Sequence, residues 1–159
     1  MILGTGIDLA EVPRVRAAIE RYGRRFIERI YTPAEIAYVE RKANRYERYA
    51  ARFAAKEAGM KAIGTGWRHG VRWQDFEVLN LPSGRPTLRL HGAAARVAER
   101  LGVRAISLSL THTAQQGMAF VILEGGDCTA TSCSHPPGPH GVARFPAART
   151  PARCKSCGE

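Results

Sequence analysis

The 159-residue sequence has no cysteine before position 125, and all four of its cysteines lie beyond that point. The body of the chain therefore neither depends on disulfide bonds nor uses a cysteine nucleophile. No apolar run approaches the roughly 18 to 20 residues that a membrane span needs. The first residues, MILGTGIDLAEV, carry an aspartate at position 8 and lack the basic-then-apolar pattern of a signal peptide. We expect a soluble, cytoplasmic protein without a membrane partner.

Acidic residues are scarce relative to basic ones, since 14 Asp and Glu stand against 24 Lys and Arg and give a formal net charge of +10. This excess favours an acidic partner: nucleic acid, an anionic membrane, a phosphorylated ligand or an acidic protein. Net charge alone does not choose among these classes. A chain of 159 residues, 45% of them hydrophobic, suits one domain or one domain with an appendage.

The stretch after Gly125 lacks the residues that build a core. Residues 126–159 contain no Leu, Ile, Met, Trp or Tyr, but they hold five of the nine prolines. Too little apolar area can be buried there to offset the entropy of ordering the segment. We therefore divide the chain into a domain at 1–125 and a tail at 126–159 that is predicted to be disordered. The alternative is a zinc site, with candidate ligands Cys128, Cys133, His135, His140, Cys154 and Cys157.

Hydrophobic periodicity predicts the order of elements in the domain. An apolar run at 2–9 predicts a strand that ends at Asp8, and apolar residues at every third or fourth position predict one amphipathic helix over 12–30. Thr32, Pro33 and Glu35 form a capping box that starts a second helix. The other expected elements are a helix at 45–63, strands at 71–81 and 87–90, a helix at 92–101, and strands at 106–111 and 117–123. These segregated runs predict an α+β fold in which helices pack on an antiparallel sheet.

An acid interrupts an apolar face of the predicted helix at 45–63. Glu57 shares that face with Ala50, Phe53, Ala54, Met60 and Lys61. A carboxylate in such a place needs a partner. Lys61, one turn later, is one candidate, and a divalent cation shared with a second carboxylate is the other. Asp8 could be that second carboxylate, because carboxylate oxygens suit Mg²⁺.

Phosphate-binding features surround these acids. Gly64-Thr65-Gly66 follows the helix, and glycine lets backbone amides approach phosphate oxygens, although the tripeptide matches neither the Walker nor the dinucleotide fingerprint. Arg52, Lys56 and Lys61 could meet phosphate as cations.

Several segments occur together in a recognisable order. These are Gly6-Ile7-Asp8-Leu9, Tyr31-Thr32-Pro33-Ala34-Glu35, the block 52–66 with Arg52-Phe53-Ala54-Ala55-Lys56-Glu57-Ala58, then 73–78 with Gly84-Arg85-Pro86, and 107–113. In this combination the chain resembles the holo-[acyl-carrier-protein] synthases, the small trimeric branch of the 4′-phosphopantetheinyl transferases. The resemblance covers residues 1 to about 124 and includes nothing of the tail. Thr111 departs mildly from the family, in which many members have serine before the histidine.

The resemblance implies an activity. Phosphopantetheine would pass from coenzyme A to a serine of apo acyl carrier protein, and adenosine 3′,5′-bisphosphate would be released. By the same resemblance Asp8 and Glu57 would bind Mg²⁺, and Lys61 would stabilise the leaving diphosphate. Glu57 and Lys61 would be the catalytic residues, while Glu57, Glu35 and a metal-bound water all remain open as the base.

The resemblance also implies binding sites and an assembly. The enzyme would be a homotrimer with its site between subunits, acting in fatty acid biosynthesis or on a polyketide carrier. The acidic carrier protein would dock on Arg14, Arg21 and Arg25, which share one flank of the predicted helix at 12–30; a solvated basic face is the alternative. Coenzyme A would be bound by Arg52, Lys61, Gly64, His112 and Thr113, with a structural strand-end histidine as the alternative for His112.

Two other classes of function compete with this one. A nucleic-acid-binding module would need basic residues interleaved with exposed aromatics, whereas Tyr22, Phe26 and Phe53 lie on apolar stripes. We therefore expect no nucleic-acid partner. A Mg²⁺-dependent nucleotide hydrolase could use the same acids, but the sequence has no Walker motif.

Overall fold

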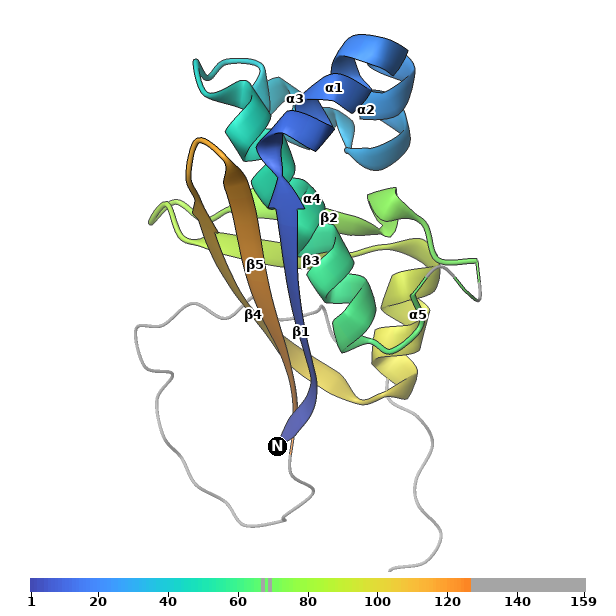
Figure 1. The fold of residues 1–159 in the computed structure, drawn as a ribbon. Coiled ribbons are helices and arrows are strands. Elements are labelled where there is room, and N and C mark those ends of the chain that lie inside the picture. The colour runs from blue at the N-terminus through green and yellow to red at the C-terminus, as the bar shows by residue number, and fades with distance from the viewer. Residues whose placement is uncertain (67, 69, 127–159) are drawn as a thin grey trace, which may run out of the picture.

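The computed structural model describes residues 1–66, 68 and 70–126. A three-stranded antiparallel sheet lies at its centre (Figure 1), with strand order β1 (Ile2–Glu11), β5 (Gln116–Gly125) and β4 (Val103–His112). This arrangement confirms the predicted α+β class with an antiparallel sheet. Strand β1 continues past Asp8 to Glu11, so the prediction that it ends at Asp8 is wrong. Asp8 lies within the paired strand, opposite Ala119.

Helix α4 (Arg45–Ala62) covers one face of this sheet at very short range. A Cβ atom placed on Gly6 would lie 1.9 Å from the Ala58 carbonyl oxygen, and one on Gly117 would lie 2.5 Å from the Ala51 nitrogen. Only glycine permits so close an approach of strand and helix backbones. The helix itself contributes small buried side chains, namely Ala50, Ala51, Ala54, Ala55, Ala58 and Ala62.

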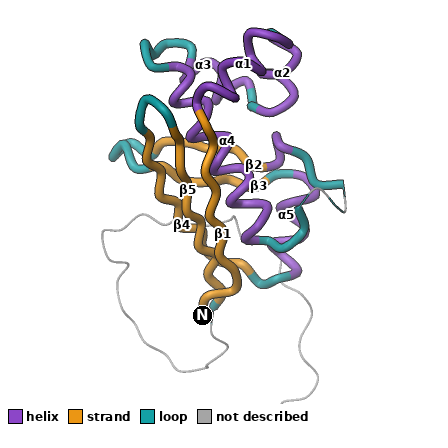
Figure 2. The backbone as a smooth tube through the Cα atoms, viewed as in Figure 1, coloured by secondary structure: helices purple, strands orange, loops and turns teal. Residues whose placement is uncertain are grey.

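Three short helices gather at one end of the sheet (Figure 2): α1 (Val12–Tyr22), α2 (Arg24–Ile30) and α3 (Pro33–Val39). The predicted single helix over 12–30 is therefore wrong. Gly23 ends α1 with φ at 57°, a left-handed conformation that glycine adopts without strain, and the chain restarts as α2. The predicted capping box is confirmed, because Thr32 Oγ1 accepts from the Glu35 backbone N–H and Glu35 Oε2 accepts from that of Thr32.

A hairpin of β2 (Phe76–Asn80) and β3 (Pro86–Leu90) leads into helix α5 (Gly92–Arg100). The strand predicted at 71–81 begins only at Phe76, because Trp73–Asp75 forms a turn of 3₁₀ helix, η1. Side-chain hydrogen bonds favour this turn: the Asp75 carboxylate accepts from the Arg72 N–H, and the Gln74 amide donates to the Tyr31 carbonyl.

Large side chains fill the core between α4, the hairpin and the short helices. The rings of Tyr31 and Tyr49 lie 4.7 Å apart, and Phe76, Met60 and Leu88 are almost completely buried. No helix among the described residues is both long enough and apolar enough to cross a bilayer. The predicted tail beyond Gly126, with its candidate zinc ligands, lies outside the described residues.

Candidate active site

Asp8 faces the helix that carries Glu57. Side chains alternate along a strand, and Gly4 and Gly6 abut the backbone of α4, so Asp8 lies on the same face of β1. Lys61 Nζ donates to Asp8 Oδ1 at 2.7 Å and to the Ile7 carbonyl at 3.0 Å. Glu57 is half-buried and precedes Lys61 by one turn on the same helix face. The structure thus brings Asp8 and Lys61 into contact between β1 and α4, with Glu57 one turn away on the same helix face.

The donor set at this contact suits a magnesium ion that is shared with a substrate. Among the described residues no group of three or more His, Cys, Asp or Glu side chains could hold a metal on its own. Mg²⁺ commonly uses only one or two protein carboxylates and completes its shell with water and phosphate oxygens. The Asp8 side chain keeps 17% of its surface exposed, so a phosphate-bearing ligand can reach it. Asp8 and Glu57 therefore fit Mg²⁺ of this kind.

Lys56 does not lie where the sequence reasoning placed it. The prediction that it could meet phosphate is wrong, because its side chain is completely buried. Its Nζ donates to Glu35 Oε2 at 2.8 Å, to the Trp73 carbonyl at 3.3 Å and to the Phe76 carbonyl. Burial lowers the pKa of Lys56, and the Glu35 carboxylate opposes that shift.

Glu35 is excluded as the general base that the sequence left open. Its side chain is also completely buried. Oε2 accepts from Lys56 and from the Thr32 N–H, while Oε1 accepts from the Val78 N–H at 3.1 Å. Because a general base must come within hydrogen-bond reach of the proton that it removes, Glu35 cannot serve a substrate serine.

Arg52 points into the protein one turn before Lys56. Its guanidinium lies over the Tyr38 ring, 4.5 Å from the centroid, and Nη2 donates to Asn80 Oδ1 at 3.0 Å. Burial lowers the pKa of Arg52, although neighbouring Glu35 and Tyr38 oppose the change. Nε is buried without a hydrogen-bond partner in the described structure, so the guanidinium retains an unused donor.

The remaining residues predicted to bind coenzyme A lie apart from Asp8. His112 is exposed at the end of β4, and Thr113 begins the turn to β5, where its hydroxyl accepts from the Gln116 N–H. Strand β5 separates them from β1. Gly64, exposed with φ at 73°, lies beyond the far end of α4 from Arg52.

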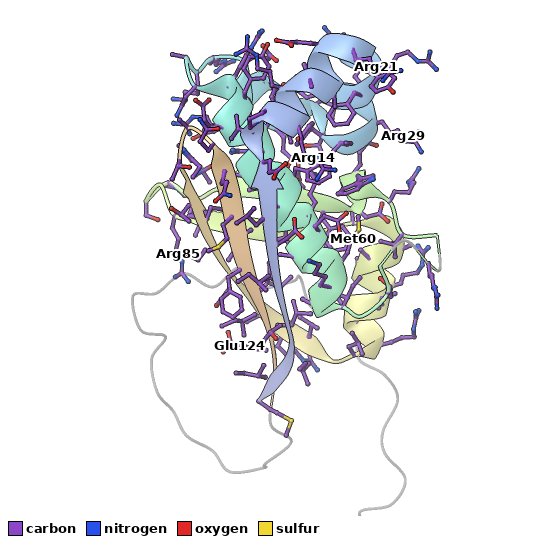
Figure 3. The ribbon with its side chains drawn as sticks, viewed as in Figure 1. Arg14, Arg21, Arg29, Met60, Arg85 and Glu124 are labelled. Atoms are coloured by element: carbon purple, nitrogen blue, oxygen red, sulfur yellow. The ribbon has the colours of Figure 1, made fainter. Side chains whose placement is uncertain are left out.

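The three arginines predicted to bind a carrier protein do not share one helix. Arg14 and Arg21 lie on α1 and Arg25 lies on α2, beyond the break at Gly23, so the predicted single flank is wrong. All three are exposed. Figure 3 shows Arg14, Arg21 and Arg29 around this helical end of the molecule.

Glu77 is an interacting residue that the sequence reasoning missed. It is nearly buried, accepts from Thr32 Oγ1 at 2.9 Å, and lies 2.9 Å from His91 Nε2. Burial alone would raise the pKa of the Glu77 carboxyl, but hydrogen bonds from His91 and Thr32 outweigh it and hold the pKa below its ordinary value. The alternation of polar and apolar residues along a short strand shows which residues share a face. It does not show contacts with residues distant in the sequence, such as Thr32 and His91.

We predict that Glu77→Gln lowers stability in a pH-dependent way. A carboxyl whose folded-state pKa is depressed stabilises the protein above its unfolded-state pKa, and this contribution is lost as the pH falls through the folded value. Urea titration should show a free energy of unfolding about 1 kcal/mol lower for the variant at pH 7. The difference should shrink below about pH 4. An equal difference at both pH values would contradict this assignment.

Comparisons with known proteins identify the family of the chain. The family model of the 4′-phosphopantetheinyl transferase superfamily matches residues 4–120. The holo-[acyl-carrier-protein] synthase of Solibacter usitatus is 77% identical over 124 residues, which cover 78% of this chain and 99% of that protein.

Solved structures give the same result. The crystal structure of the Neisseria meningitidis holo-[acyl-carrier-protein] synthase has a TM-score of 0.72 and 32% identity, covering 78% of this chain and 99% of that one. The Bacillus anthracis enzyme, solved in complex with CoA (3′,5′-ADP), has a TM-score of 0.65 and 34% identity over 79% and 99% of the two chains.

The mixed fold, the contact of Lys61 with Asp8 and the family match together define the class of protein as a transferase of phosphopantetheine. With the matches above, the chain belongs to the 4′-phosphopantetheinyl transferase superfamily, among the holo-[acyl-carrier-protein] synthases.

Proposed function

We propose that the chain transfers 4′-phosphopantetheine from coenzyme A to a serine hydroxyl of an apo acyl carrier protein in a Mg²⁺-dependent reaction. The observation that carries the proposal is the 2.7 Å contact of Lys61 with Asp8, with Glu57 one turn away on the same helix face. The coenzyme A complex of the Bacillus anthracis relative supports the same donor.

The reaction exchanges one phosphorus–oxygen bond for another. The serine oxygen bonds to the phosphorus that carries the pantetheine, the bond to adenosine 3′,5′-bisphosphate breaks, and the serine proton passes to a base. Asp8 and Glu57 would hold Mg²⁺, which when bound neutralises charge on the phosphoryl oxygens. Lys61 would donate a hydrogen bond to the departing 5′-phosphate of adenosine 3′,5′-bisphosphate and balance its charge. Glu57 or a water at the site remains available as the base.

We propose that a second copy of the chain completes the coenzyme A site. Lys61 and Gly64 of one subunit would bind the nucleotide together with His112 and Thr113 of another, since β5 separates the latter pair from Asp8 in a single chain. Arg52 is only 4% exposed and is engaged by Tyr38 and Asn80, so it would have only its unpartnered Nε to offer such a ligand. The sheet face opposite α4 supports an assembly of subunits, which we propose is a homotrimer. It exposes the large apolar side chains Ile7 (56%), Leu9 (48%), Met118 (36%) and Phe120 (40%). Such a contiguous apolar patch is typical of an interface between subunits.

We also propose that the acidic carrier protein docks on Arg14, Arg21 and Arg25. The neighbouring Arg16 and Arg24 are engaged by Glu20 and Glu28 at 2.7 and 2.6 Å. Arg14 is 84% exposed and lies 3.8 Å from Glu11, a contact that water screens. The helical end therefore presents cations that an acidic helix can approach.

Intact-mass analysis of the carrier protein tests the proposed function. The purified protein, coenzyme A and Mg²⁺ should add the mass of one phosphopantetheine to an apo carrier, and a carrier whose acceptor serine is replaced by alanine should gain none. Hydrolysis of coenzyme A with no change in carrier mass would instead support the hydrolase alternative. Tight nucleic-acid binding with no modified carrier would support the binding module.

A further inference from the structure

The buried ion pair between Lys56 and Glu35 has no part in the proposed reaction, yet it adjoins Glu57 in the chain. Lys56 Nζ has an acceptor for each of its three protons, one on Glu35 and two on the backbone of the 73–76 segment. Both oxygens of Glu35 are also engaged, by Lys56 and by backbone N–H groups of Thr32 and β2. The pair therefore joins α4 to α3, η1 and β2 through a fully satisfied network.

Stability alone does not account for this pair. Removing two charges from water carries a large desolvation cost for each ion, and well-packed apolar residues in their place are often as stabilising or more so. The pair instead restricts the orientation of α4 relative to its neighbours, because its hydrogen bonds require particular positions of the Lys56 and Glu35 side chains.

The other side of α4 has few directional contacts. Apart from the hydrogen bonds that the long, exposed Lys61 side chain donates to Asp8 and to the Ile7 carbonyl, the helix meets β1 and β5 there through alanines and through backbone contacts at Gly4, Gly6 and Gly117. Such contacts set the distance between helix and sheet, but alanine ridges are shallow and resist rotation of the helix about its axis only weakly. A rotation of about 10° moves a side-chain end by about 1 Å, given a helix radius of about 5 to 6 Å. Functional groups must be held to within about 0.5 Å.

We infer that the Lys56–Glu35 ion pair is a positioning device for Glu57, which fixes the rotation of α4 so that Glu57 is aimed at Asp8. Lys56 is anchored on the flank that faces α3 and β2, and the next residue is turned by about 100° around the helix. The anchor thereby sets the direction of the Glu57 side chain. This inference rests on the proposed function, since it concerns the metal pair named there.

Mn²⁺ binding to the protein with saturating coenzyme A and without carrier protein tests the inference. The variant Glu35→Gln/Lys56→Gln removes both charges but keeps donors and acceptors for the surrounding backbone groups. We expect its dissociation constant for Mn²⁺, followed by electron paramagnetic resonance, to rise about 10-fold or more. Its kcat should fall while its KM for coenzyme A changes by less than about twofold.

A matched control separates positioning from loss of stability. Val97→Ala on α5 removes buried methyl groups remote in sequence from both acids and should lower Tm without altering Mn²⁺ affinity. Glu35→Gln alone retains the shape of the side chain and should show a smaller effect in the same direction if the double variant does not fold.

The outcomes are distinct. Mn²⁺ affinity within about twofold of wild type in a folded Glu35→Gln/Lys56→Gln protein would overturn the inference, as would an equal loss in Val97→Ala. In that case the proposed function would stand if Asp8→Asn still abolished Mn²⁺ binding. Equal Mn²⁺ binding by wild type and Asp8→Asn would overturn both proposals.

Discussion

Asp8→Asn and Glu57→Gln are each expected to reduce transfer of phosphopantetheine by roughly 10³-fold while the protein remains folded. Each change removes a negative charge from the contact between β1 and α4 and preserves the shape of the side chain. In Asp8→Asn the amide oxygen could still accept a hydrogen bond from Lys61, which lies 2.7 Å from the Asp8 oxygen. Turnover at saturating Mg²⁺, together with Tm from thermal unfolding, measures the two quantities separately.

Acids on the same elements provide controls for this result. Glu11→Gln changes an exposed carboxylate on β1, and Glu47→Gln changes one in the first turn of α4. Both should retain nearly full turnover. Near-normal turnover of Asp8→Asn or Glu57→Gln would refute the assignment of these residues as metal ligands.

Reversing charge at Arg14, Arg21 and Arg25 is expected to raise the KM for the acidic carrier protein about 10- to 100-fold at low salt. The three side chains are exposed on α1 and α2, whereas Asp8, Glu57 and Lys61 lie on β1 and α4. The KM for coenzyme A should therefore change little. Because exposed charges are screened, the effect should diminish as ionic strength rises.

A second triple variant with the same change in net charge serves as the comparison. Arg96, Arg100 and Arg104 are also exposed, and they lie on α5 and at the start of β4, away from α1 and α2 (Figure 1). Reversing them should leave the KM for the carrier nearly unchanged. Equal effects from the two triple variants would mean that only total charge matters, and a matching rise in the KM for coenzyme A would assign Arg14, Arg21 and Arg25 to the nucleotide site.

Local sequence signals predicted the parts of the fold that depend on local physics. The capping box at Thr32 and Glu35 and the long helix after Asn44 were both foreseen, because caps and helical periodicity act within a few residues. The break at Gly23 was missed because the apolar spacing continues across it, so that only the positive φ of the glycine separates α1 from α2.

The buried ion pair could not be predicted from spacing, since Glu35 and Lys56 meet only through tertiary packing. The alanines and the glycine of α4 lie on one side of the helix, and Lys56 lies outside that side, so the helical pattern gives no sign that the Lys56 side chain is buried. Glu57, by contrast, stands out in the sequence because it interrupts an apolar stripe, and the structure leaves its side chain half-buried one turn before Lys61.

The close approach of Gly4, Gly6 and Gly117 to the backbone of α4 limits which substitutions the enzyme can tolerate. Because no Cβ fits against α4 at Gly4 or Gly6, the strand and helix backbones set the gap between Asp8 and Glu57, which we propose share a ligand. Any side chain at Gly6 would act as a wedge and move the two carboxylates apart without altering either. These glycines, which have no functional group, thus set the width of the site. Substitutions that inactivate the enzyme should therefore occur at the glycines as well as at Asp8 and Glu57.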